Sequence, residues 1–126
     1  MGEIQRVLLI DWPSREVPDS LARAGFSVTA QERDGTYAAY EMDGAVVARR
    51  DVEEPEGVDA VYAYRPLDEL AEIADVAARL GATTLYWETG PSPATPQDVA
   101  RARQVVERAG LDFVHGRISH HLAVGE

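Results

Sequence analysis

Two arginines stand where apolar stretches of this 126-residue sequence end, and their chemistry suits an anionic ligand. Arg15 follows the segment RVLLIDWPS, and Arg65 is the last residue of DAVYAYR. A guanidinium group can donate two parallel hydrogen bonds to a phosphate or a carboxylate. Each arginine also precedes acids with which it could pair instead, namely Glu16, Asp19, Asp68 and Glu69. The sequence therefore predicts phosphate binding at Arg15 and Arg65, with ion pairs inside the chain as the alternative.

Catalytic and metal-binding patterns are much weaker in this sequence. Asp11, Glu88 and His115 end expected strands and could act as a general acid or base, but no partner stands at a fitting spacing. His120 and His121 are adjacent, which is not a usual spacing for two ligands of one metal ion. The chain has no cysteine and no lysine, which excludes thiolate nucleophiles and Schiff bases. We expect no metal site, and the sequence does not indicate an enzyme.

The elements that position these residues follow a strand–helix–strand pattern. Residues 59–65 are β-branched and aromatic, and the run stops at Pro66, whose missing N–H cannot continue a strand ladder. Apolar residues then recur every three or four positions over 67–80, which predicts a helix with one buried face. Gly81 ends that helix, and a further strand begins two residues later. A crossover of this kind joins two parallel strands in a right-handed unit.

The rest of the chain repeats this unit, so we expect a single α/β domain over residues 1–126 with a Rossmann-like, three-layer architecture. About five parallel strands are expected, at 5–11, 26–31, 59–65, 83–88 and 111–115, and helices at 15–24, 67–80 and 96–109. Ser14 and Thr95 are the expected helix caps. Strand 5–11 should be central, with strands 26–31 and 83–88 on its two sides. Function in such sheets lies just beyond the carboxyl ends of the strands.

One inserted segment interrupts this alternation. Asp43-Gly44 separates two β-prone runs, which is typical of a tight hairpin turn. We expect a β-hairpin over residues 36–50, in which Met42 pairs with Ala45 and Tyr40 pairs with Val47. The hairpin should form a small antiparallel flap at one side of the sheet.

Composition limits the classes of partner. The formal net charge of −10 argues against nucleic acid and anionic membranes. No run approaches the roughly 18 apolar residues that a membrane span needs, and no charged segment precedes an apolar core at the start. The absence of cysteine suits a reducing compartment. We expect a cytoplasmic protein, a monomer or homodimer, that binds a small molecule and neither nucleic acid nor membrane.

Three segments carry a resemblance to a known family. VDAVYAYRP, GATTLYWETG and ARQVVERAGLDFVHGR occur in an order and at separations similar to those of the small stand-alone CoA-binding proteins. The same domain occurs in the CoA-binding subunit of succinyl-CoA synthetase. The matching positions, between Val7 and Arg117, are Ser14, Ala24-Gly25-Phe26, Val58-Asp59, Arg65, Gly81-Ala82, Gly90, Ala109-Gly110-Leu111 and Gly116-Arg117. The resemblance implies a five-stranded parallel Rossmann-like sheet that holds CoA across its strand ends.

The resemblance also implies a binding site. The glycine-free turn DWPSR takes the place of the family's glycine-rich phosphate turn, so phosphate contacts should come from the first helix N-terminus and Arg15. Arg65 and Arg117 would anchor the ligand further, and Tyr64 or Trp87 could stack on the adenine. The expected site residues are Trp12, Pro13, Ser14, Arg15, Glu32, Arg33, Tyr64, Arg65, Glu88, Thr89, Gly90 and Arg117.

Glu32 and Arg33 bear on the choice of nucleotide. Glu32 stands about 20 residues after the phosphate turn, where an acid of a Rossmann domain binds a free ribose hydroxyl. CoA carries a ribose 3′-phosphate, which Glu32 disfavours and Arg33 favours. The alternative for both residues is a solvated surface position.

We therefore expect a binding module for CoA, an acyl-CoA or a related adenine nucleotide, with no catalysis of its own. The alternative is a degenerate Rossmann domain that binds no nucleotide and acts as a protein-interaction module. The missing glycines favour this alternative, and the hairpin would then be the contact surface.

Overall fold

The central strand of the molecule is β1 (Arg6–Ile10), which has a parallel neighbour on each side. In the computed structural model, which describes residues 5–12, 14–32, 34–88 and 94–116, it belongs to a seven-stranded sheet with the order β4-β3-β2-β1-β5-β6-β7. The other parallel strands are β2 (Ser27–Gln31), β5 (Ala60–Tyr64), β6 (Thr84–Glu88) and β7 (Asp112–His115). The five expected parallel strands are thus confirmed, each within one or two residues of its expected bounds.

The expected neighbours of β1 are only half correct. β2 does flank β1, but the other neighbour is β5, and β6 pairs with β5 instead. The reason is that the β5–β6 unit keeps consecutive strands adjacent, as short crossover connections require. β5 therefore occupies the place beside β1 that we expected strand 83–88 to fill.

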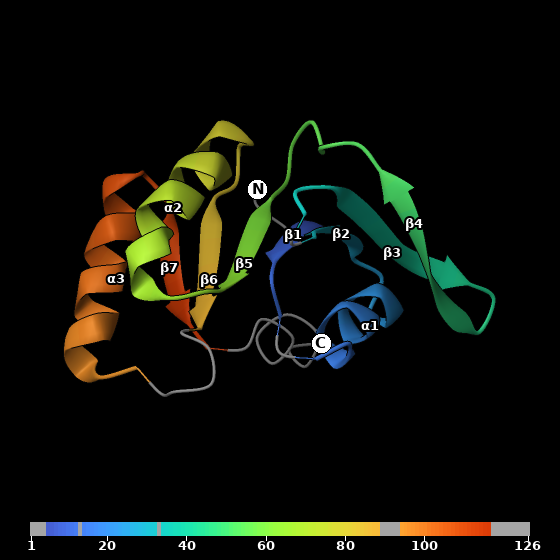
Figure 1. Cartoon of the computed structure of the whole chain (residues 1–126), viewed down its shortest axis with the longest axis horizontal. Coiled ribbons are helices and arrows are strands. Elements are labelled where there is room, and N and C mark those ends of the chain that lie inside the picture. Colours follow the sequence, from blue (N-terminus) through green and yellow to red (C-terminus); the bar gives the residue numbers. More distant parts are fainter. Residues whose placement is uncertain (1–4, 13, 33, 89–93, 117–126) are drawn as a thin grey trace.

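Three helices cover the two faces of the sheet, which confirms the three-layer α/β architecture. They are α1 (Glu16–Arg23), α2 (Leu70–Arg79), which a short 3₁₀ turn η1 (Leu67–Glu69) precedes, and α3 (Pro96–Arg108). α2 and α3 lie together beside β5, β6 and β7, whereas α1 lies beside β2 and β3 (Figure 1). No helix among the described residues combines the length and apolar character needed to cross a bilayer.

Alternating residues of the strands form two separate cores, because successive side chains of a strand point to opposite faces. Leu8, Val61, Leu85 and Trp87 pack with the apolar stripes of α2 and α3 on one face. Val7, Leu9, Val28 and Tyr62 pack with Val17 and Leu21 of α1 on the other. The aromatic side chains of Tyr62, Tyr86 and Trp87 are all buried in these cores.

Of the two expected helix caps, the one at the start of α3 is confirmed and the one at the start of α1 is wrong. Thr95 Oγ1 accepts the Asp98 N–H at 3.1 Å, and Asp98 Oδ2 accepts the Thr95 N–H at 3.3 Å, which completes a capping box. Ser14, in contrast, does not cap α1. The N-cap residue of α1 is Arg15, because the helix begins at Glu16, one residue later than expected. The Arg15 side chain makes no capping hydrogen bond.

The hairpin consists of β3 (Tyr37–Asp43) and β4 (Val46–Val52), and it extends the sheet antiparallel to β2. The expected register is wrong by two residues: Met42 pairs with Val47, and Tyr40 pairs with Arg49. The turn residues are Gly44 and Ala45, and Gly44 has φ 69°. A positive φ at the first turn residue alone matches a type II′ turn, which needs glycine there and leaves Asp43 in the strand.

Candidate functional site

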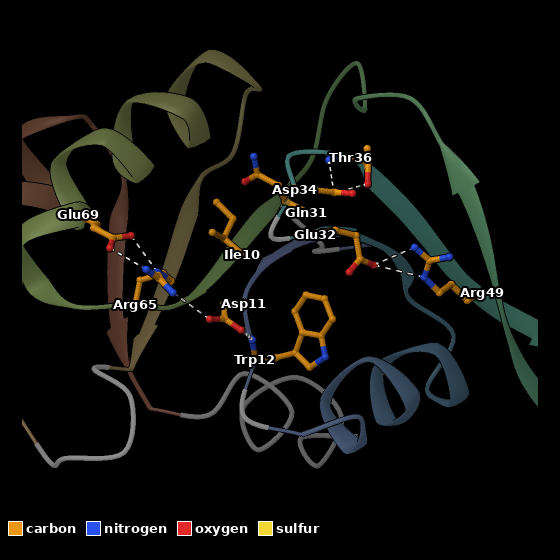
Figure 2. Close-up of a pocket in the computed structure, with 10 residues that line it drawn as sticks. All are labelled: Ile10, Asp11, Trp12, Gln31, Glu32, Asp34, Thr36, Arg49, Arg65 and Glu69. Carbon is orange, nitrogen blue, oxygen red and sulfur yellow. Dashed lines mark hydrogen bonds and ion pairs between the residues drawn. The ribbon is translucent and has the colours of Figure 1, made fainter.

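A cavity of about 930 Å³ lies at the carboxyl ends of β1, β2 and β5. Open α/β sheets bind ligands in this crevice, where successive connections leave the central strand in opposite directions. Its lining combines polar side chains with an apolar wall, and Figure 2 draws all ten residues: Ile10, Asp11, Trp12, Gln31, Glu32, Asp34, Thr36, Arg49, Arg65 and Glu69. The cavity is therefore at the edge of the sheet that sequence analysis singled out.

Asp11 marks the point where β1 ends and the cavity begins. It has φ 62° and is the only described residue other than glycine with a positive φ. Aspartate tolerates this left-handed conformation better than most residues, although at some cost. Its Oδ1 atom accepts the Trp12 N–H at 2.9 Å, which stabilises the turn. A glycine-rich phosphate turn uses glycine for such a conformation, so Asp11 makes the sharp turn here and adds a negative charge.

Arg65 directly follows β5 and connects the residue after β1, Asp11, with Glu69 of the 3₁₀ turn η1. Its Nη1 atom donates to Asp11 Oδ2 at 3.0 Å, while Nε and Nη2 donate to Glu69 at 2.8 and 2.7 Å (Figure 2). The hydrogen bonds with Glu69 and then Asp11 raise the pKa of the guanidinium, and Arg65 lowers the pKa of Glu69. The ion pair with Glu69 that we considered as the alternative is thus present. Two of the five guanidinium N–H groups have no acceptor among the described residues, so Arg65 can still donate to a ligand.

Glu32 lies opposite, directly after β2, and is oriented by Arg49 of β4. Arg49 Nε and Nη2 donate to Glu32 Oε2 at 3.3 and 3.2 Å, and these hydrogen bonds raise the pKa of Arg49. The Oε1 atom accepts no hydrogen bond from a described residue. In Figure 2 that oxygen points away from Arg49, toward the side of the cavity where Trp12 lies. One carboxylate oxygen of Glu32 is therefore open to a ligand.

The remaining wall is partly apolar and partly a tight polar turn. The Trp12 ring meets the Tyr40 ring edge-on, with centroids 6.3 Å apart, which fixes the indole at the cavity. At the β2–β3 turn, Asp34 Oδ1 accepts from the Thr36 hydroxyl at 2.7 Å and from the Thr36 N–H at 3.0 Å. These hydrogen bonds lower the pKa of Asp34.

The expected phosphate turn offers few donors. Arg15 does not line the cavity; its side chain is 68% exposed, and its Nε atom lies 3.6 Å from Asp19 Oδ1, as in the ion-pair alternative. The N–H of Val17 already donates to the Ser14 carbonyl oxygen at 3.1 Å, and Pro18 has no N–H. Of the first helical residues, only Glu16 keeps an amide with no acceptor among the described residues, and its side chain is acidic.

Other expected site residues lie at the ends of β5 and β6, outside the cavity lining. Tyr64 and Glu88 are partly buried, and Glu88 accepts a hydrogen bond from the Tyr62 hydroxyl. Trp87 is fully buried, and its indole N–H donates to the Arg65 carbonyl oxygen at 2.9 Å, so it presents no face to an adenine. Of the expected set, the cavity brings together Trp12, Glu32 and Arg65. The expected residues Pro13, Arg33, Thr89, Gly90 and Arg117 lie outside the described part of the chain.

Sequence analysis missed the contribution of the hairpin and its turn. Asp34, Thr36 and Arg49 line the cavity because β3 and β4 continue the sheet beside β2. Asp11 was considered only as an acid without a partner, whereas Arg65, 54 residues away, provides one. The sequence gives one indication that Arg49 could reach Glu32, namely its position on the second strand of the expected hairpin. That indication predicts the contact only when the hairpin register is correct.

His115, the candidate general base at the end of β7, does not join the cavity. His115 is exposed and lies against the Trp87 ring, with centroids 5.7 Å apart, away from the cavity lining. Within residues 5–12, 14–32, 34–88 and 94–116, no three histidine or acidic side chains are grouped as metal ligands would be. His120 and His121 fall outside those ranges.

Solved structures share this fold at low sequence identity. One is the crystal structure of Prb, a PH1109 protein redesigned for binding, with a TM-score of 0.62, 19% identity, and 98% of this chain and 86% of that chain covered. A second is a conserved hypothetical protein from Pyrococcus furiosus, with a TM-score of 0.55, 21% identity, and coverage of 93% and 98%. A third, an uncharacterized protein, has a TM-score of 0.54 and 13% identity, with 98% of each chain covered. No family model and no curated protein matches the sequence. The likenesses establish the fold, and the function must be argued from the cavity.

Proposed function

We propose that this protein is a binding module for an adenine nucleotide, of the class that includes CoA and acyl-CoA, with no catalysis of its own. The observation that carries the proposal is the cavity of about 930 Å³ at the carboxyl ends of β1, β2 and β5. Its size suits a small-molecule ligand, and its position is where Rossmann-like sheets hold nucleotides. The resemblance of three segments to the small stand-alone CoA-binding proteins points to the same class of ligand.

The cavity supplies the two kinds of contact that a nucleotide needs. Arg65, fixed by three hydrogen bonds, presents its unused N–H groups as a rigid donor for a phosphate or another anionic group. Trp12 offers an apolar ring for a base or a sugar, and Glu32 offers an acceptor for hydroxyls. In this arrangement the phosphates lie toward β5, and the adenosine lies toward β2.

Electrostatics limits how many phosphates the cavity accepts. Its lining carries four carboxylates, of Asp11, Glu32, Asp34 and Glu69, and two guanidinium groups, of Arg49 and Arg65, so its formal charge is −2. The distant part of the protein's charge matters less, because a like-charge pair ~15 Å apart in water costs only ~0.3 kcal/mol before salt screening. The local carboxylates therefore decide selectivity, and they favour ligands whose charge is concentrated near Arg65.

The test is a thermal-shift screen with CoA, acetyl-CoA, NAD and ATP, with calorimetry on the same four nucleotides. A ligand present at 100 times its dissociation constant should add roughly 2.7 kcal/mol to the free energy of unfolding and raise the melting temperature visibly. We expect at least one of the four to do so. No response to any of them, in the shift and in calorimetry, would contradict the proposal.

A second candidate function has its own support. All described charged groups of the cavity except Asp34 are in ion pairs, and the hairpin end exposes Met42 by 41% and Val46 by 59%. A degenerate Rossmann domain that contacts another protein through the hairpin would show both features. A flat response in the nucleotide screen would favour this second function.

A further inference from the structure

The strand β4 forms one edge of the seven-stranded sheet, and no described strand pairs with its outer side. Figure 1 shows it on the outside of the hairpin, with β3 between it and β2. Its pairing with β3 is uninterrupted from Val46 to Val52, so the strand is seven residues long and contains no bulge. The opposite edge strand, β7, has only four residues. A long and regular edge strand is a template for pairing with a further strand.

The features that usually protect an edge strand are weak in β4. Proline and unpaired charges, above all those of lysine, commonly prevent edge strands from pairing. Residues 46–52 contain neither proline nor lysine. Arg49 contacts Glu32 at 3.2 Å and Asp51 at 2.9 Å. Arg50 contacts Glu41 of β3 at 3.2 Å. Because each arginine already has a carboxylate partner, a further strand would not meet an unpaired positive charge.

The hairpin register identifies the backbone groups that β4 leaves unused. Asp43 and Val46 flank the two-residue turn, and in such hairpins the flanking residues exchange backbone hydrogen bonds. Hydrogen-bonded and non-hydrogen-bonded pairs then alternate along the ladder. Val47, Arg49 and Asp51 therefore direct their N–H and C=O groups away from β3. These three residues offer the regular row of donors and acceptors that an antiparallel strand needs.

A second copy of β4 complements this edge when the two strands run antiparallel about Arg49. This register pairs all seven residues of each strand, and every contact occurs twice because the arrangement is two-fold symmetric. It places Val46 opposite Val52 of the second copy, at both ends of the paired strands. Val46 is 59% exposed in the single chain, so the pairing covers an apolar side chain that would otherwise face water.

The charged side chains at the two-fold axis also complement each other. Arg49 uses three of its five N–H groups, so two have no acceptor among the described residues. The Asp51 side chain is 86% exposed, and its Oδ2 atom accepts no hydrogen bond from a described residue. In the paired strands, the Asp51 carboxylate of each copy lies diagonally across from Arg49 of the other, within reach of that long side chain. Carboxylates of both copies thus offset the repulsion between the two arginines.

We propose that the outer edge of β4 is a self-association surface, through which two copies of the chain form a two-fold dimer with one continuous sheet. The contact involves one strand of each copy and is smaller than a standard interface, so the dissociation constant should be on the order of 100 µM. Arg49 belongs both to this surface and to the lining of the cavity, so the second copy adjoins the candidate site.

The first test is sedimentation equilibrium of the wild-type chain and two variants, from about 10 µM to about 1 mM protein in about 0.15 M salt. Asp51→Pro removes one outward N–H, which proline permits on the open side of an edge strand. Its dissociation constant should rise by roughly tenfold or more, since a strand hydrogen bond is lost and the ring obstructs the partner. Asp51→Ala is the matched control, because it removes the side chain and keeps the N–H. It should weaken the dimer by less than about threefold, as expected for an exposed ion pair.

The second test locates the axis. The chain has no cysteine, so one introduced cysteine reports whether a residue faces its own counterpart. Arg49→Cys should form a disulfide-linked dimer on oxidation, because the Cα atoms of a directly opposed, hydrogen-bonded pair lie about 5.5 Å apart. Ala48→Cys and Arg50→Cys should not, because each is displaced along the strand from its counterpart by more than a disulfide can span.

Three outcomes overturn the inference. One is a wild-type chain that remains monomeric up to about 1 mM. Another is an Asp51→Pro variant that keeps its wild-type melting temperature and still associates as tightly as the wild type. The third is cross-linking of Ala48→Cys or Arg50→Cys in place of Arg49→Cys, which would contradict the pairing about Arg49.

Discussion

An Arg–Asp ion pair connects β1 with β5 at each end of β1, but the surroundings of the two pairs differ. At the amino end, Arg6 Nη2 contacts Asp59 Oδ1 at 3.3 Å. At the carboxyl end, the roles are exchanged, and Arg65 Nη1 contacts Asp11 Oδ2 at 3.0 Å. Both pairs connect adjacent parallel strands, so the differences between them reflect their surroundings and not their chemistry.

The amino-end carboxylate is saturated by the backbone. Asp59 Oδ2 accepts the N–H groups of Gln5 and Arg6 at 2.9 and 2.8 Å, and these hydrogen bonds lower the pKa of Asp59. The hollow at this edge, whose lining includes Arg6 but not Asp59, measures about 360 Å³, much less than the cavity at the other end. Asp59 therefore serves to fasten the start of β1 to the chain that enters β5.

The carboxyl-end pair is set in a strained and open environment. Asp11 adopts φ 62°, Arg65 keeps unused donors, and both line the cavity of about 930 Å³. Backbone strain of this kind persists only where the surrounding structure enforces it, and it is found most often at functional sites. The comparison teaches that an Asp–Arg pair fastens two strands at one edge of the sheet, whereas at the other edge it leaves N–H groups of Arg65 without an acceptor among the described residues, beside a cavity.

The largest expected effect is on ligand binding by the Arg65→Ala variant. Loss of a charge-assisted contact should weaken binding of whichever screened nucleotide responds by roughly 1.5–3 kcal/mol, or about 10- to 100-fold. Because the side chains of Arg65 and Glu69 are 35% and 42% exposed, the cost in stability should stay below about 1 kcal/mol. Calorimetry and a urea titration measure the two quantities.

Arg6→Ala is the matched control, because it removes the equivalent pair from the amino edge. It should leave nucleotide affinity at the wild-type value. Equal losses of affinity in the two variants would remove the distinction between the edges.

The second effect is on stability, through Asp59→Ala. This change leaves the N–H groups of Gln5 and Arg6 without their charged acceptor, so the free energy of unfolding should fall by about 1–3 kcal/mol. Chemical denaturation checks the value, and nucleotide affinity should be unchanged. A variant as stable as wild type would show that Asp59 does not fasten β1.

The smallest effect is the pH dependence of that same contribution. The hydrogen bonds from the backbone of Arg6 and Gln5 depress the pKa of Asp59 below its ordinary value of 3.8, so the carboxylate stabilises the fold fully above that value. Its contribution is lost as the pH falls through the depressed pKa. The difference in unfolding free energy between wild type and Asp59→Ala should therefore be constant near neutral pH and shrink below about pH 4. A difference that persists undiminished at lower pH would point to packing and not to the charge.

Most of the fold could be predicted because the local spacing of apolar residues along the sequence indicates the helices and strands. Residues 67–80 repeat apolar side chains at helical spacing, and the five parallel strands are short runs of β-branched and aromatic residues bounded by turns. The hairpin register could not be read in the same way, since both a turn at Asp43-Gly44 and one at Gly44-Ala45 put glycine in a central position. The backbone conformation at Gly44 decides between them, and the sequence does not specify it.

The site was harder to predict because its parts come together only in the tertiary fold. Trp12, Glu32 and Arg65 could be found by the rule that strand ends face the ligand. The pairing of Arg65 with Asp11 and of Glu32 with Arg49 depends on which strands are neighbours, and β5 takes the place beside β1 that we expected β6 to fill. The scarcity of free amides at the start of α1 follows in part from Pro18, which the sequence shows, and in part from the hydrogen bond of the Val17 N–H, which no sequence pattern reveals.

The most direct test is an amide chemical-shift map of the ¹⁵N-labelled protein titrated separately with CoA, acetyl-CoA, NAD and ATP. Binding at the carboxyl edge should move the backbone resonances of Trp12, Glu32 and Arg65, and leave those of Arg6 and Asp59 at the amino edge in place. Saturable binding with shifts confined to the amino edge or to the hairpin would contradict the account, and so would a spectrum that does not change at all.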